Sequence, residues 1–91
     1  MKNRSRSEIV RSILEATSTS EGTTKTRLMY KSYLSYNQLK EYLRTLQENG
    51  LVDYAVGRRC YRITEKGILL MQLHSKMEEI APINYFNVKN T

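Results

Sequence analysis

The sequence predicts a small, mainly α-helical domain that carries one β-hairpin. Three observations support this fold class. Apolar residues recur at helical spacing in separate segments, capping residues precede these segments, and two short β-branched and aromatic runs follow the third helix. The chain has 91 residues, of which 40% are apolar and 26% charged, and this balance is typical of one compact domain.

The first expected helix covers residues 7–17. Its apolar side chains form one stripe, made of Ile9, Val10, Ile13 and Leu14. Ser5 or Ser7 can cap this helix, and Glu8 follows Ser5 at the spacing of a capping box. Residues 18–23 are rich in serine, threonine and glycine and contain no apolar side chain, so they predict a loop.

A short second helix is expected over residues 25–31. Thr24 offers its N-cap, and Leu28 and Met29 can face inward. After a brief turn, Leu34 supplies a further apolar side chain.

The third helix has the clearest signals in the chain and should run from residue 36 to residue 48. Ser35 and Gln38 have capping-box spacing, and Asn49-Gly50 supplies a left-handed stop. Its apolar positions recur at i, i+4 and i+7, and they are Leu39, Leu43 and Leu46.

Beyond Gly50 the pattern changes from helix to strand. Residues 51–54 and 60–63 contain β-branched and aromatic side chains, which favour a two-stranded hairpin. Its tip contains Gly57, Arg58 and Arg59 and is therefore basic.

A last helix is expected over residues 65–81. Thr64 caps it, and Pro82 stops or kinks it before a tail at 82–91. Its apolar residues step by three and four, as in a heptad seam, and they are Leu70, Leu73, Met77 and Ile80.

The order of these elements is that of a winged helix-turn-helix domain at residues 7–64, preceded by a flexible basic arm at 1–6. In such a domain the third helix is narrow enough to enter the major groove of DNA, which is ~12 Å wide. The hairpin then reaches the flanking backbone. We therefore predict binding to double-stranded DNA.

The candidate DNA-contacting residues lie on the second helix, the third helix and the hairpin tip. Asparagine can pair with an adenine edge, whereas lysine and arginine can reach guanine or phosphate. Tyrosine at the edge of the third helix lies near the phosphates. The predicted set is Lys25, Arg27, Tyr36, Asn37, Lys40, Arg44, Arg58 and Arg59.

Other interpretations of this surface stay open. Lys40 and Arg44 alternate with Glu41 and Glu48, which also fits the solvated face of an ordinary surface helix. The domain would then serve as a protein-protein interaction module or subunit adaptor that does not bind DNA directly. RNA binding is a weaker third possibility, because an exposed stacking platform is not evident among the seven tyrosines.

The positive charge is unevenly distributed along the chain. The formal net charge is +6, and residues 1–64 hold twelve basic and six acidic residues. Residues 65–91 hold three of each. The excess therefore belongs to the expected DNA-binding unit, and the last helix and tail are expected to serve assembly.

The sequence offers little for catalysis or cofactors. One histidine, His74, and one cysteine, Cys60, cannot make a zinc site, which needs about four ligands. We expect His74 at a surface or interface and Cys60 in the core. No phosphate-binding loop or dinucleotide fingerprint occurs. We therefore expect no enzyme, no metal, no cofactor and no evident small-molecule ligand.

Nothing in the sequence indicates membrane insertion or secretion. No apolar run approaches the ~20 residues of a transmembrane helix, and the amino terminus lacks the apolar stretch of a signal peptide. We expect a cytoplasmic, nucleoid-associated protein.

The chain resembles the ten-kilodalton archaeal winged-helix DNA-binding proteins, which are chromatin-associated or regulatory homodimers. The resemblance covers roughly residues 7–80 and rests on ILEA at 13–16, KTRLMYKSYLSYNQLKEYLRTLQENGLVDY at 25–54 and YRITEKG at 61–67. It implies a winged-helix fold and a dimer formed by antiparallel pairing of the last helices. The implied interface residues are Leu70, Leu73, Met77 and Ile80.

The last helix supports a homodimer on its own residues as well. Residues 68–71 are apolar on all sides, so we expect Ile68 or Leu69 to pack on the domain and a second face to need a partner. At about sixteen residues, or ~24 Å, this helix is shorter than the coiled-coil helix of the family. Tyr85 and Phe86 in the tail would lie on the partner or across the hairpin.

Overall fold

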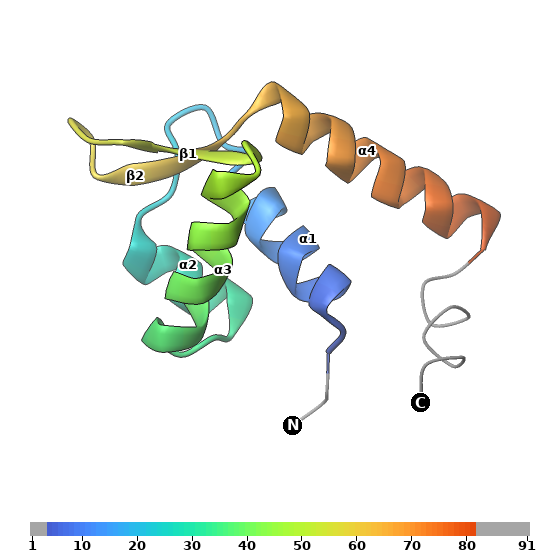
Figure 1. The fold of residues 1–91 in the computed structure, drawn as a ribbon, viewed down its shortest axis with the longest axis horizontal. Helices are drawn as coiled ribbons and strands as arrows, with labels where there is room; N and C mark the ends of the chain where they lie inside the picture. The colour runs from blue at the N-terminus through green and yellow to red at the C-terminus, as the bar shows by residue number, and fades with distance from the viewer. Residues whose placement is uncertain (1–3, 82–91) are drawn as a thin grey trace.

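The structure, a computed structural model, describes residues 4–81 of the chain. The described part is mainly helical and contains four helices and a two-stranded antiparallel sheet, so the predicted fold class is confirmed. Figure 1 shows α1, α2 and α3 gathered below the hairpin, with α4 extending to one side. The elements in chain order are α1 (Arg6–Ala16), α2 (Lys25–Ser32), α3 (Tyr36–Glu48), β1 (Val52–Ala55), β2 (Cys60–Ile63) and α4 (Glu65–Ile80).

Capping boxes set the beginnings of two helices. The Ser5 hydroxyl accepts from the Glu8 amide, and the Glu8 carboxylate accepts from the Ser5 amide. Ser35 and Gln38 make the same reciprocal pair at the start of α3. Helix α1 therefore begins at residue 6, one residue before the predicted start, whereas α3 has the predicted bounds.

The turn between α2 and α3 is made by a residue in the left-handed conformation. Tyr33 has φ 56°, and its amide donates to the Met29 carbonyl, which ends α2. Arg4 donates to the Ser32 carbonyl, and its guanidinium lies 5.9 Å from the centre of the Tyr33 ring. Arg4 is thus in contact with the folded domain, within the segment expected to be a flexible arm.

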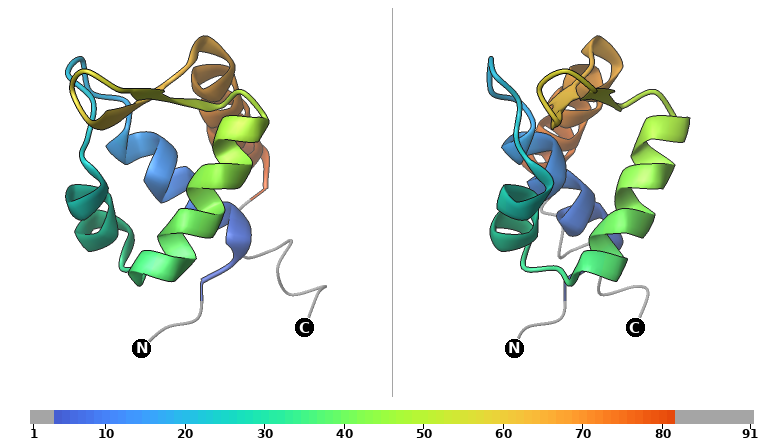
Figure 2. Two further views of the ribbon diagram at one scale, coloured as in Figure 1. Left: turned by 60° about the vertical axis from the view of Figure 1, so that its left-hand side comes forward. Right: turned by 90° about the vertical axis from the view of Figure 1, so that its left-hand side faces the viewer.

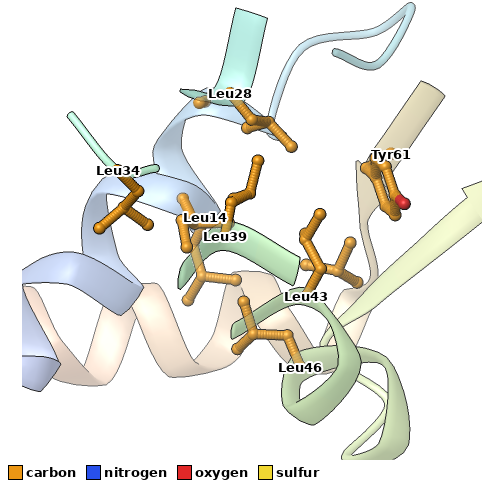
Figure 3. Packing of buried hydrophobic residues seen from close by; sticks show 10 residues of the cluster. Leu14, Leu28, Leu34, Leu39, Leu43, Leu46 and Tyr61 are labelled. Carbon is orange, nitrogen blue, oxygen red and sulfur yellow. The ribbon is translucent and has the colours of Figure 1, made fainter. Parts of the chain in front are cut away.

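The core is formed by the apolar stripe of α3. Leu39, Leu43 and Leu46 are all less than 4% exposed, as their spacing predicts. Figure 3 shows these three leucines meeting Leu14 from α1 and Leu28 from α2. The core therefore fixes α2 and α3 relative to each other, which is what a helix-turn-helix requires.

The hairpin is tied to the loop before α2. Strands β1 and β2 pair in antiparallel register, with Tyr54 opposite Tyr61 and Ala55 opposite Cys60. On the other side of β2, the Thr23 amide donates to the Tyr61 carbonyl (N–O 2.9 Å) and the Tyr61 amide donates to the Thr23 carbonyl (2.8 Å). The loop predicted at residues 18–23 thus ends in an isolated β-bridge to β2.

Helix α4 packs on the domain through a different face from the one expected. Ile68 and Leu69 are 40% and 54% exposed, so the expectation that one of them packs on the domain is wrong. The buried position is Gly67, and Met71, His74 and Glu78 are the partly buried ones that follow it.

Gly67 sets this orientation. A Cβ at this position would overlap the carbonyl oxygen of Leu51 and lie 2.6 Å from Cγ1 of Ile63. Because only glycine permits this approach, the face of α4 that begins at Gly67 turns inward. Residues 71, 74 and 78 follow on the same side at ~100° per residue.

Some expectations fall outside the described residues. These are the effect of Pro82 and the placement of the tail with Tyr85 and Phe86. Among the helices of residues 4–81, none combines the length and the apolarity that crossing a membrane requires.

Candidate nucleic-acid interface

The exposed face of α3 is polar and electrically neutral. Asn37, Lys40 and Arg44 are all exposed, as predicted. Arg44 forms an ion pair with Glu41 one turn earlier, and both side chains are more than 60% exposed. Two basic and two acidic residues occupy this helix, so α3 itself brings no net positive charge to the surface. An exposed pair of this kind contributes little to stability, and the Arg44 guanidinium can exchange Glu41 for another anion.

A groove runs beside α3 and joins it to α2 and the hairpin. Its volume is about 420 Å³, and Lys25 from α2, Lys40 from α3 and Tyr61 from β2 contribute to its lining. The Nζ atom of Lys25 lies 5.1 Å from the centre of the Tyr36 ring, a cation–π distance. The structure therefore brings two predicted residues of α2 and α3 into direct contact.

Residues of α2 and of the hairpin line a second concave surface together. Arg27, in the first turn of α2, and Arg58, at the hairpin tip, line the same pocket of about 550 Å³. The Thr24 hydroxyl accepts from the amide of Arg27, and the positive end of the helix dipole points out of this turn. Glu21 also lines this surface and lowers its net charge. Two arginines that lie 31 positions apart in the sequence thus face one shared space.

The hairpin tip carries two exposed arginines, Arg58 and Arg59. The turn is closed by the Arg59 amide, which donates to the Ala55 carbonyl at 2.8 Å, and Arg59 has φ 54°. Val56 at this tip is 78% exposed. Within residues 4–81, neither Arg58 nor Arg59 forms an ion pair. The tip therefore presents two uncompensated cations.

These features share one side of the molecule. In Figure 1 the hairpin tip and α2 both lie on the left, at the side opposite α4. Figure 2, which turns this side toward the reader, shows the hairpin crossing above α2 and α3. Helix α2 carries three basic and no acidic residues. The neutral face of α3 therefore has positive charge near it, from α2 beside it and from the hairpin above.

Sequence reasoning missed several residues of this surface. Gln47 and Tyr61 line the groove beside α3; Gln47 could have been found, because it lies seven residues after Lys40 on the same side of the helix. Tyr30 and Tyr33 are 76% and 77% exposed. No periodicity in the sequence signals the exposure of these two rings.

The apolar residues of α4 are exposed in the single chain. Leu70, Leu73, Met77 and Ile80 have exposed fractions of 37%, 53%, 47% and 81%. Leu69, which was expected as a candidate for packing on the domain, lies on the same side and is 54% exposed. At ~100° per residue these five side chains span an arc of about 100° that points away from the face with Gly67. An exposed apolar arc of this kind is typical of an interaction surface.

The two residues with reactive side chains lie apart. Cys60 is 5% exposed, as expected of a core residue, and its thiol lies 3.2 Å from the Glu21 carbonyl oxygen. His74 faces α1 from the inner side of α4. Between residues 4 and 81, no three histidine, cysteine, aspartate or glutamate side chains gather closely enough to hold a metal ion.

Comparisons with known proteins agree with this geometry. A family model described as winged helix-turn-helix matches residues 3–82. No curated protein matches the chain. Among solved structures, the chain is similar to Sso10a-2, described as a DNA-binding protein from Sulfolobus solfataricus, with 29% identity and a TM-score of 0.70. This match covers 96% of this chain and 90% of that one. The resemblance to the ten-kilodalton archaeal winged-helix DNA-binding proteins is confirmed.

Proposed function

Because the chain belongs to the winged helix-turn-helix family, we propose that it binds double-stranded DNA. The observation that carries this proposal is that cations from α2 and from the hairpin tip gather beside α3. Lys25 lines the groove beside α3, and Arg27 and Arg58 line one neighbouring surface together. Sso10a-2, which shares this fold, is described as DNA-binding.

In this proposal α3 enters the major groove, and its polar residues read the bases. Asn37 and Gln47 each carry an amide that can make two hydrogen bonds with adenine, and Lys40 can reach guanine. Arg44 can leave Glu41 for a base or a phosphate. Because α3 has no net charge, it contributes to sequence preference more than to affinity.

The basic residues beside α3 anchor the phosphates. Lys25 and Arg27 act from α2, together with the amides of its first turn, and Arg58 and Arg59 act from the hairpin. Tyr36, which lies beside Lys25, sits at the edge of this anchor. If a dimer neutralises about six phosphates, log K falls with log salt at a slope near −5.

We also propose that the protein is a homodimer that pairs through α4. The exposed apolar arc of Leu70, Leu73, Met77 and Ile80, widened by Leu69, supports this assembly. Two α4 helices in antiparallel contact would carry one DNA-binding head at each end. Each head would dock in its own major groove, so that binding is bivalent. Sedimentation as a monomer at micromolar concentration would argue against this assembly.

We infer a cytoplasmic, nucleoid-associated role as a transcriptional regulator or an architectural chromatin protein. A gel shift with a random pool of duplexes and a selected duplex, at two salt concentrations, separates the two. A regulator prefers the selected duplex at both concentrations, whereas an architectural protein binds both duplexes alike. Absence of any shift at the lower salt overturns the proposal of DNA binding.

The rival function is a protein-interaction module or subunit adaptor. The Arg44–Glu41 pair and the exposed rings of Tyr30 and Tyr33 favour this alternative, since neutral, aromatic surfaces are common at protein interfaces. It predicts no DNA shift together with retention of a protein partner in a pull-down. The gel shift therefore decides between the two functions.

A further inference from the structure

Three tyrosines lie on the connection between α2 and α3. Tyr30 is in the last turn of α2, Tyr33 is the C-cap of that helix, and Tyr36 begins α3. These residues are 76%, 77% and 46% exposed. Figure 2 shows the connection at the end of the two helices that lies farther from the hairpin.

The fold does not require a tyrosine at position 33. The backbone there has φ 56°, a left-handed conformation that glycine and asparagine adopt at lower cost after a helix. Because Tyr33 is 77% exposed, its side chain contributes little to the core. Neither Tyr30 nor Tyr33 lines the groove beside α3 or the surface at the hairpin. An exposed aromatic residue on a strained backbone indicates a binding function.

The surroundings of these rings are basic. Residues 22–40 contain four lysines or arginines and no aspartate or glutamate. The Arg4 guanidinium lies 5.9 Å from the centre of the Tyr33 ring, and Lys31, which follows Tyr30, is exposed. Neither cation forms an ion pair within residues 4–81. We call Tyr30, Tyr33, Arg4 and Lys31 the tyrosine face.

Open aromatic rings beside cations suit unpaired nucleotides. Every base has a face on which a tyrosine can stack, and cations hold the phosphates between the bases. In a duplex the neighbouring base pairs cover these faces, so stacking on a ring requires a single strand. Tyr30 and Tyr33 are three residues apart, a separation of at most ~11 Å along the chain. Both rings are therefore within reach of one short strand.

We propose that the tyrosine face binds single-stranded DNA. This assignment rests on the proposed DNA binding, because the face adjoins the duplex interface at Tyr36. The Tyr36 ring lies 5.1 Å from Nζ of Lys25, which lines the groove beside α3. A strand that leaves a duplex held by α3 can reach the tyrosine face. The unpaired cations favour this polyanion over a neutral protein surface.

The test compares labelled oligonucleotides of about twelve nucleotides, which is within the site size of single-strand binders. The probes are oligothymidylate, oligouridylate, a blunt duplex and an abasic strand, which keeps the phosphates but lacks the bases. Fluorescence anisotropy with the intact chain measures each affinity at one salt concentration. We expect oligothymidylate to bind about tenfold more tightly than the abasic strand. It should also bind at least as tightly as oligouridylate, because the thymine methyl adds apolar contact.

Two substitutions of Tyr33 test the ring. Tyr33→Asn removes it but suits the left-handed backbone, so this variant should stay folded and bind oligothymidylate about tenfold more weakly. Tyr33→Phe keeps the ring and should keep the affinity. Both variants should bind the duplex as the original protein does, and circular dichroism confirms that they are folded.

A matched pair of lysine variants tests the charge. Lys31→Gln should weaken oligothymidylate binding and reduce its salt slope by about 0.7, the contribution of one cation on a single strand. Lys76→Gln, an exposed lysine on α4, should change neither the affinity nor the slope.

Several results overturn the proposal. Absence of oligothymidylate binding, or equal binding of the abasic strand, means that the rings do not stack on bases. Tighter binding of oligouridylate assigns the face to RNA instead. Equal loss of duplex and single-strand affinity in Tyr33→Asn makes the ring part of the duplex interface, and equal loss in Tyr33→Asn and Tyr33→Phe excludes stacking. The affinities for single strands are measured without duplex, so failure of duplex binding in the gel shift is seen separately.

Discussion

The Arg11 guanidinium on α1 donates a hydrogen bond to the Glu78 carboxylate on α4, with an Nη1–Oε1 distance of 2.6 Å. Burial lowers the pKa of Arg11, but the charges and hydrogen bonds of Glu78 and Glu15 outweigh it and raise that pKa above its ordinary value. In residues 4–81 it is the one ion pair that links α4 to another element. It therefore holds the last turns of α4 against α1, whereas Gly67 holds the first.

The first prediction concerns this ion pair. Glu78→Gln should lower the free energy of unfolding by about 0.5–1 kcal/mol, because the pair is only partly exposed. Glu79→Gln is the matched control, since its carboxylate is 72% exposed and 4.0 Å from Lys76. Urea denaturation measures both. Equal losses in the two variants would show that Arg11 does not stabilise α4 through Glu78.

The second prediction concerns the close approach at Gly67. Gly67→Ala should destabilise the domain by about 1–3 kcal/mol, as overpacking of a close contact does, because its Cβ would meet the Leu51 carbonyl. Gly57→Ala at the hairpin tip should change stability little, because its Cβ would meet no atom within 4 Å. If the Gly67→Ala variant is as stable as the original protein, α4 does not pack on the domain through the face that contains Gly67.

The helix beginnings could be predicted from the sequence because their causes are local. Ser5 with Glu8, and Ser35 with Gln38, each satisfy backbone amides within four residues. The stripe of Leu39, Leu43 and Leu46 likewise depends only on helical period. Such signals fixed the element order, and the order alone indicated a winged helix-turn-helix.

The tertiary contacts of the site could not be predicted in this way. The Thr23–Tyr61 bridge joins residues 38 positions apart and involves one residue of a loop, so no pattern marks it. Arg27 and Arg58 face the same pocket only because this bridge holds the hairpin beside α2. The contact between Gly67 and a backbone carbonyl decides which face of α4 packs on the domain. Residues 68–71 are apolar on all sides, so their pattern does not indicate which face is buried.

The third prediction tests the phosphate anchors. Arg58→Ala and Arg59→Ala should each weaken binding to all duplexes alike, and each should reduce the salt slope of the dimer by about 2, because each substitution removes one cation from each head. Lys76→Ala, an exposed lysine on α4, should leave both affinity and slope unchanged. Fluorescence anisotropy at several salt concentrations measures this. An unchanged salt slope in both arginine variants would show that the hairpin does not contact the phosphates.

The fourth prediction tests base reading by α3. Asn37→Ala and Gln47→Ala should change which duplexes are selected from a random pool, with about 1–3 kcal/mol lost at the affected base pair. Arg27→Ala should leave the selected sequences the same and weaken all of them. Selection followed by sequencing distinguishes these outcomes. If Asn37→Ala and Arg27→Ala have the same effect on the selected sequences, the proposal that α3 reads bases while α2 binds phosphates is wrong.

The last prediction tests the dimer and its consequence for DNA binding. Leu73 lies in the middle of the exposed arc of α4 and is 53% exposed in the single chain. Leu73→Glu should leave the head folded, because Leu73 is not part of its core, and should convert the dimer into a monomer. A carboxylate buried without a partner in the α4–α4 contact is strongly disfavoured.

Gln72→Glu provides the matched control, since it adds the same charge at a neighbouring exposed position outside the arc. Sedimentation should show a monomer for Leu73→Glu and a dimer for Gln72→Glu. Loss of the second head removes the gain from bivalent docking, so Leu73→Glu should bind a long duplex about 10²–10⁴-fold more weakly, which is the gain that linked sites provide. A Leu73→Glu monomer with full affinity would mean that a single head suffices, whereas a Leu73→Glu dimer would place the interface on another surface.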